Sequence, residues 1–193
     1  MPLDVALLTL LHLLIFAYWL GGDLGVFYSS YLLTDPKRAP AGRLAAGKVV
    51  ADVDLAPRIA LLMTLPTGLA LADAKGWIAL PMPALLGAFG AAAAWIFVVL
   101  RLHAKHGPPQ LRRVDLGLRL AFFLALVGCG SAGLLGALEL PLFLSAKLLL
   151  LAFCVAMGLL VRASLAPFGP AYISLATNGP SPESDAAIRA SLG

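Results

Sequence analysis

A histidine lies inside the first long apolar stretch of the chain, in the run from Leu10 to Leu14. An ionisable side chain at this depth costs about a few kcal/mol in hydrocarbon, so His12 needs a partner, a water-filled cavity or a bound ligand. Asp23 follows eleven residues later, close to three turns of an α-helix, and Trp19 lies on the same side between them. His12, Trp19 and Asp23 therefore predict one polar stripe that faces the interior of a helix bundle.

The composition assigns the chain to a broad class. Of its 193 residues, 61% are hydrophobic and 12% are charged, and the mean hydropathy is +0.93. Soluble domains carry roughly 25% charged residues, and no soluble core of this length could bury so much apolar surface. We therefore predict an integral membrane protein with the lipid bilayer as its main partner. The net charge of +4 resides in the connecting segments and does not indicate nucleic-acid binding.

Apolar runs bounded by charge, Pro or Gly predict an all-α, polytopic transmembrane helix bundle with about five spans. The predicted spans cover residues 3–33, 55–72, 82–102, 116–138 and 140–161. The first exceeds the roughly 20 residues that a span needs, so it should tilt or protrude. Only Glu139 and Pro141 separate the last two spans, which predicts a very tight turn. Residues 1–165 would form the bundle, and residues 166–193 a cytoplasmic tail with a short helix from Ser184.

The basic residues predict the orientation. They gather between the first and second spans and between the third and fourth, as Lys37, Arg38, Arg43, Lys48, Lys105, Arg112 and Arg113. Cytoplasmic loops carry the excess of Lys and Arg. The N-terminus is therefore expected outside and the C-terminus in the cytoplasm of a bacterial-type inner (plasma) membrane.

The orientation also assigns a depth to each intramembrane charge, at about 1.5 Å per helical residue. His12 in the first span and Lys147 in the fifth fall at matching depths, and Asp23 falls level with Arg58 of the second span. Structural interpretations stay open beside functional ones. Asp23 and Arg58 could form an ion pair or contact a propionate or a proton path, and Lys147 could extend to the outer headgroups. His12 could bond a facing Ser or Thr, or bind a ligand or cofactor.

Other ligand-type residues carry weaker signals. His103 and His106 share one face at the end of the third span and could hold a metal, but their basic neighbours favour a solvated helix end. Cys129 and Cys154 fall inside spans and form no CxxC motif, which favours packing over a disulfide or a soft-metal site.

Several stretches resemble a known group of membrane proteins. Residues 11–13 and 19–22 are similar to the opening helix shared by the copper-resistance protein D family and the HemJ-type membrane protoporphyrinogen oxidases. Residues 145–151, followed by Arg162 and Pro167, resemble the core of the copper-resistance protein D domain. Residues 57–59 and 66–69 resemble the second HemJ-type helix, so the resemblance covers about two-thirds of the chain. The chain departs from the HemJ-type pattern by its fifth predicted helix, and it is shorter than the copper-resistance proteins.

This resemblance implies haem b, with His12 as an axial ligand and Lys147 as its partner or a supporting group. The first hypothesis is therefore a haem b redox protein in electron transfer or quinone-linked oxidation, with protoporphyrinogen oxidase-like activity implied by resemblance alone. Trp19, Asp23 and Arg58 join His12 and Lys147 as expected cofactor-binding residues. One alternative is a copper transport or resistance protein, in which His12 would bind copper. Another is a non-catalytic anchor, and a homo-oligomer or a subunit of a larger membrane complex is expected in either case.

Overall fold

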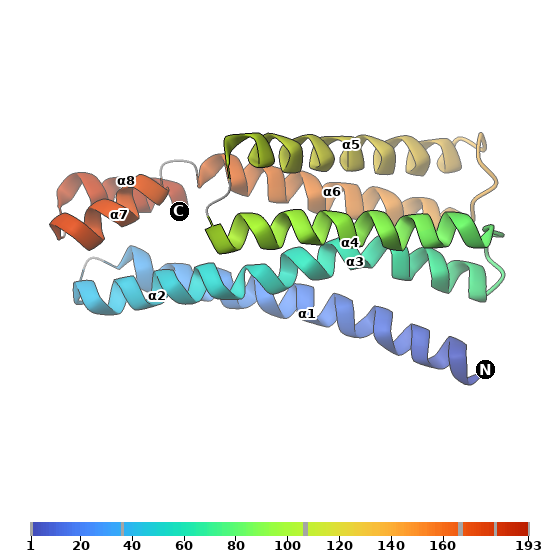
Figure 1. The fold of residues 1–193 in the computed structure, drawn as a ribbon, viewed down its shortest axis with the longest axis horizontal. Coiled ribbons are helices and arrows are strands. Elements are labelled where there is room, and N and C mark those ends of the chain that lie inside the picture. Colours follow the sequence, from blue (N-terminus) through green and yellow to red (C-terminus); the bar gives the residue numbers. More distant parts are fainter. Residues whose placement is uncertain (1, 36, 106–107, 166–167, 180, 193) are drawn as a thin grey trace. The chain divides into compact units, whose positions relative to one another are not determined.

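The computed structural model describes residues 2–35, 37–105, 108–165, 168–179 and 181–192, and these residues form helices and no strands. Eight helices follow one another along the chain (Figure 1): α1 (Leu3–Thr34), α2 (Pro40–Val53), α3 (Leu55–Ala74), α4 (Met82–Lys105), α5 (Pro109–Leu134), α6 (Leu142–Ser164), α7 (Phe168–Asn178) and α8 (Pro182–Leu192). Five regions are long and apolar enough to cross a membrane, namely α1, the region Pro40–Ala74, α4, α5 and α6. The prediction of an all-helical chain with five candidate spans is confirmed for the described residues, and the orientation of the termini stays a prediction.

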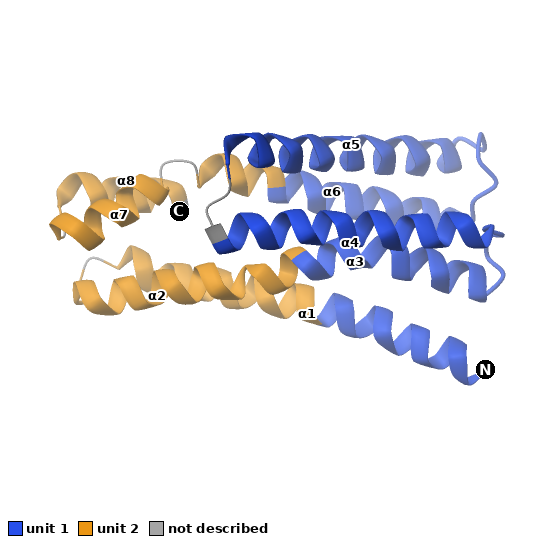
Figure 2. Cartoon of the chain, viewed as in Figure 1, with its two compact units in different colours: residues 1–17, 59–158 blue, residues 18–58, 159–193 orange. Residues whose placement is uncertain are grey.

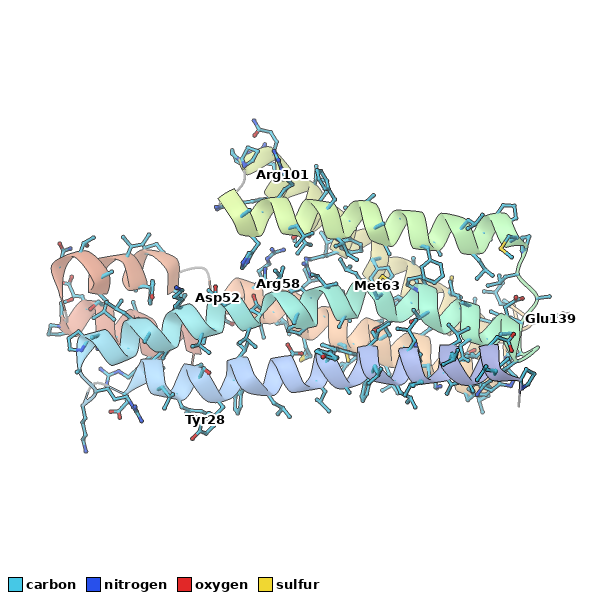
Figure 3. The ribbon with its side chains drawn as sticks, turned by 60° about the horizontal axis from the view of Figure 1, so that its bottom comes forward. Tyr28, Asp52, Arg58, Met63, Arg101 and Glu139 are labelled. Carbon is cyan, nitrogen blue, oxygen red and sulfur yellow. The ribbon has the colours of Figure 1, made fainter. Side chains whose placement is uncertain are left out.

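The chain divides into two compact units, which Figure 2 shows in blue and orange. Unit 1 comprises residues 1–17 and 59–158, and unit 2 comprises residues 18–58 and 159–193. Within unit 1, the start of α1 and the α3–α4 and α5–α6 connections lie at one end of the helices, and the start of α5 lies at the other (Figure 1). Arg101 lies toward the second end and Glu139 lies at the first (Figure 3).

The two connections at the first end of unit 1 share one backbone design. Gly76 and Gly136 follow the ends of α3 and α5 with φ angles of 68° and 74°, a conformation that glycine adopts without a steric penalty. Pro81 and Pro141 each come five residues later, directly before the next helix. Their carbonyls accept N–H bonds of 2.9 Å from the first turns of α4 and α6. Each connection therefore ends one helix and starts the next by the same means.

This design corrects two predicted boundaries. The fourth span was predicted over 116–138 and the fifth over 140–161, but α5 covers Pro109–Leu134 and α6 covers Leu142–Ser164. A hydropathy pattern does not reveal that Gly136, in a left-handed conformation, ends α5 at Leu134. It also does not reveal that α5 begins at Pro109 and continues through the polar residues before position 116. The connection is consequently longer than the predicted tight turn.

The helices α5 and α6 approach closely because α5 presents glycines toward α6. A Cβ at Gly130 would lie 2.8 Å from the Leu149 side chain, and a Cβ at Gly133 would overlap the Ser145 hydroxyl. Ser145 is fully buried at this contact. Small residues at such crossings allow van der Waals packing in place of a hydrophobic driving force, which lipid does not provide.

Unit 2 contains elements that the sequence reading missed. Residues 40–53, read as part of a basic connection, form α2, and the tail forms two helices, α7 and α8, rather than one short helix. Proline is favoured in the first turn of a helix, because its missing N–H has no partner there anyway, and α2 begins with Pro40. The apolar core of this unit consists of Leu33, Ala46, Ala171, Leu175 and Ile188.

A buried arginine connects three helices of unit 2. The Arg43 Nη2 lies 2.8 Å from Oδ1 of Asp185 on α8, an ion pair whose angles do not form a hydrogen bond. The Arg43 Nε donates to the carbonyl of Leu33 at 3.0 Å, in the last turn of α1. The Tyr172 hydroxyl of α7 donates to the Leu44 carbonyl at 2.8 Å. Arg43 thereby compensates both a helix-end carbonyl and a carboxylate.

Candidate functional site

His12 lies in unit 1 against α3. Its Nδ1 is 2.9 Å from Oγ1 of Thr67, a fully buried side chain. The Cε1–Nε2 edge of the ring adjoins Gly68, where a Cβ would lie 3.3 Å from Cε1 and 3.8 Å from Nε2. The His12 ring itself is half-buried. A threonine hydroxyl thus holds one ring nitrogen, and a glycine backbone adjoins the edge that carries the other.

The local sequence of α3 explains this contact. Thr67 follows Pro66, which lies inside the helix, lacks an N–H and weakens the helical ladder at this point. The Thr67 hydroxyl also donates to the carbonyl of Met63 at 2.7 Å, one turn earlier; Figure 3 labels Met63 on α3. Gly68 has no side chain to keep the imidazole away. The three consecutive residues 66–68 therefore shape the part of α3 that receives His12.

Lys147 of α6 is a charged neighbour of His12. The two groups interact electrostatically within unit 1. The Lys147 Nζ lies 5.6 Å from the ring centroid of Phe143, which makes an edge-on contact of 4.8 Å with Trp77. Lys147 is exposed and reaches back toward the start of α6, so the geometry is compatible with a role beside His12 and with extension to the headgroups.

Asp23 and Arg58, the second pair predicted from matching depth, both lie in unit 2, but they do not form an ion pair with each other. Arg58 forms its ion pair with Asp54, four residues earlier, and not with Asp23 as expected. Asp23 accepts a hydrogen bond from Trp19 and interacts electrostatically with Asp54 and Arg58. Matching depth correctly predicted that Asp23 and Arg58 lie near each other. The ion pair of Arg58, however, forms with Asp54, which lies one helical turn earlier on the chain.

The helices α1 and α3 cross closely beside these charges. A Cβ at Gly22 would lie 2.6 Å from Cδ of the buried Pro57. This close approach brings Trp19, Asp23 and Arg58 into one region of unit 2, while His12 and Lys147 belong to unit 1.

A buried charged cluster in unit 1 was not singled out from the sequence. Asp115 of α5 is 1% exposed and accepts hydrogen bonds from Trp95 Nε1 at 2.9 Å and from Arg119 Nε at 3.1 Å. The Arg119 guanidinium also lies 5.9 Å from the Trp95 ring centroid. The spacing of Asp115 and Arg119, four residues on one helix, was a signal available in the sequence. Both charges have partners, so the cluster fastens α4 to α5.

The remaining ligand-type residues do not assemble. His103 is exposed on α4, and His106 lies outside the described residues. Cys129 and Cys154 lie inside α5 and α6 and are not joined in a disulfide. Over the described part of the chain, no three His, Cys, Asp or Glu side chains group together as a metal-ion site would require.

Comparison with known proteins finds no relative: no family model, curated protein or solved structure matches the chain. The resemblance to the copper-resistance protein D and HemJ-type proteins consequently rests on the sequence motifs alone. Any function must be argued from the site itself.

Proposed function

We propose that the chain is a multi-pass membrane protein that binds haem b, with His12 as an axial ligand, and that it serves electron transfer or quinone-linked oxidation. One observation carries the proposal. His12 contacts the protein through Nδ1, and its Nε2 has no hydrogen-bond partner among the described residues. Histidines that bind metals use one ring nitrogen in this way while the other is held by a neighbouring group.

The donor set suits haem better than a free metal ion. The porphyrin fills four positions on iron, so the protein supplies one or two axial ligands. A copper ion held by the protein alone needs several ligands. Among the described residues, no three His, Cys, Asp or Glu side chains group together to supply them. Lys147, which interacts electrostatically with His12, offers a cation for a propionate.

The role of this chain's residues follows from that assignment. Bound haem supplies one-electron redox chemistry. His12 holds it, Thr67 and Gly68 hold the imidazole, and the surrounding apolar helices limit water. Trp19, Asp23 and Arg58 are also proposed as cofactor-binding residues, which would contact a propionate or form part of a proton path. A quinone partner, a homo-oligomer or larger complex, and protoporphyrinogen oxidase-like activity rest on the resemblance.

We also propose the orientation with the N-terminus outside and the C-terminus in the cytoplasm of a bacterial-type inner membrane. Its support is the charge of unit 1. Arg101, Arg112 and Arg113 lie toward the end where α5 begins, whereas Glu139 and Lys75 lie in the connections at the opposite end. An excess of arginine indicates the cytoplasmic side.

The test is the visible absorption of the full chain purified in detergent. Haem binding predicts a Soret band and sharp α and β bands on reduction. His12→Ala should lose these bands, and His103→Ala, which changes an exposed histidine on α4, should keep them. A colourless, folded wild-type protein contradicts the proposal, and metal analysis of that sample then separates copper binding from an anchoring role.

A further inference from the structure

Thr67 Oγ1 contacts His12 and two carbonyl oxygens of its own helix, those of Met63 at 2.7 Å and Thr64 at 3.3 Å, and these contacts together determine where the proton of His12 resides. We infer that Thr67 is a positioning residue that holds His12 in the tautomer with hydrogen on Nδ1 and thereby keeps the lone pair on Nε2. The consequence for haem rests on the proposed function, whereas the tautomer itself does not. The inference comes from the hydrogen-bond distances within unit 1.

A threonine hydroxyl has one hydrogen to donate and two lone pairs to accept with. The Thr67 Oγ1 lies 2.7 Å from the Met63 carbonyl oxygen. This is the usual length of an O–H···O bond, and two oxygens at such a distance repel unless a hydrogen lies between them. The carbonyl has no hydrogen, so the hydroxyl hydrogen must point at Met63.

The contact with His12 then has a single assignment. At 2.9 Å, Thr67 Oγ1 and His12 Nδ1 are within hydrogen-bond distance, and the hydroxyl hydrogen is already used. Nδ1 must therefore carry the hydrogen and donate it. A neutral imidazole carries one N–H, so the lone pair lies on Nε2.

This arrangement prepares His12 to bind a metal or to accept a proton at Nε2. Thr67 is fully buried, so water does not compete for its hydroxyl. Groups that orient a metal-bound histidine in this way typically change metal affinity about 10–100-fold when removed. Thr67 thus acts through His12 and does not itself touch the ligand.

The chain offers a matched control. Thr64, on the same helix, donates to the Ala60 carbonyl at 2.9 Å, the same kind of bond that Thr67 makes to Met63. It makes no described hydrogen bond to His12. Thr64→Val therefore removes a comparable hydroxyl that does not contact the imidazole. Thr67→Ser is the second control, because it keeps a hydroxyl at position 67.

The experiment is 15N NMR of the full chain, haem-free, with labelled histidine in nanodiscs at a pH where imidazole is neutral. The resonances of His12, assigned by their loss in His12→Ala, should report hydrogen on Nδ1 in the wild type. Thr67→Val should lower the ratio of the Nδ1–H to the Nε2–H form by about fivefold, the change expected for one hydrogen bond. Thr67→Ser and Thr64→Val should resemble the wild type.

A wild-type spectrum with hydrogen on Nε2 overturns the inference, as does an unchanged ratio in Thr67→Val. Should Thr67→Val fail to fold, Thr67→Ser and the wild-type spectrum still decide the tautomer. Haem titration of the same samples then separates the two proposals. An Nδ1–H wild type that binds no haem keeps the tautomer and refutes the haem function, whereas about tenfold weaker binding in Thr67→Val supports both.

Discussion

Replacing Arg43 by Met is expected to release α8 from unit 2. The Arg43 side chain is 2% exposed, and it contacts Asp185 at 2.8 Å and the Leu33 carbonyl at 3.0 Å. Methionine retains much of the length of the side chain but neither contact. The substitution therefore leaves the Asp185 carboxylate, which is 17% exposed, without its ion-pair partner, and a carbonyl in the last turn of α1 without its donor.

The magnitude follows from these two losses. Removing one partner of a buried ion pair costs about 3–5 kcal/mol, and an orphaned buried carbonyl costs about 1–3 kcal/mol. The ion pair lacks hydrogen-bond geometry and Asp185 keeps some exposure, so we expect the total to fall below the sum of the two lower limits, at about 3 kcal/mol. An isolated helix of this length is marginal in water. Most of the stability of α8 (11 residues) must therefore come from its contacts with the rest of unit 2, which we call its docking.

Hydrogen exchange of the α8 amides in the detergent-solubilised protein measures this docking. At 1.4 kcal/mol per factor of ten, Arg43→Met should raise the exchange rates about a hundredfold. Arg38→Met is the control, because Arg38 pairs with Asp35 at 3.6 Å while the two side chains are 50% and 41% exposed. An exposed pair contributes little, so the control should change exchange by no more than about twofold.

A partner substitution tests whether the charge is the cause. Adding Asp185→Leu to Arg43→Met removes the stranded carboxylate and should restore much of the α8 protection, because apolar side chains replace buried ion pairs well. The reasoning is refuted if Arg43→Met exchanges like the wild type, or if the control loses as much protection as Arg43→Met does.

Two further substitutions test packing and charge in unit 1. Gly133→Ala should lower the stability by about 1–3 kcal/mol, because its methyl group would overlap the Ser145 hydroxyl. Gly128→Ala, on the same helix, is the control: its methyl group meets open space, so the thermal midpoint should stay unchanged or rise. Asp115→Leu should cost about 3–5 kcal/mol because it removes the ion-pair partner of Arg119 and the acceptor of Trp95, and Asp115→Asn should cost less because an acceptor remains. Thermal unfolding in detergent checks both, and equal midpoints for Leu and Asn would contradict the charge argument.

Hydropathy predicted the class of the fold and the intramembrane position of His12 from the sequence. It did so because apolar runs of span length and a lone ionisable residue are visible along one chain. The same signal misplaced the end of α5 and the start of α6. The left-handed Gly136 and Pro141, rather than polarity, set those two boundaries. The helix α2 was missed because its basic residues were read only as a cytoplasmic loop.

Partners across helices were harder to predict than depth. Thr67 was not singled out as the residue facing His12, although its place between Pro66 and Gly68 marks a helix position open to close approach. The ion pair of Arg58 formed with Asp54 because local proximity on the chain outweighed matching depth on two helices. Trp95 could not have been paired with Asp115 from sequence, because that contact depends on how α4 packs against α5.

The haem content of the purified chain tests the central claim most directly. Full-length protein from haem-replete cells should hold about one haem per chain, and His12→Ala should hold almost none while keeping the same helical circular dichroism. A wild type without haem, or a His12→Ala variant that retains it in full, would contradict the assignment of His12 as the ligand.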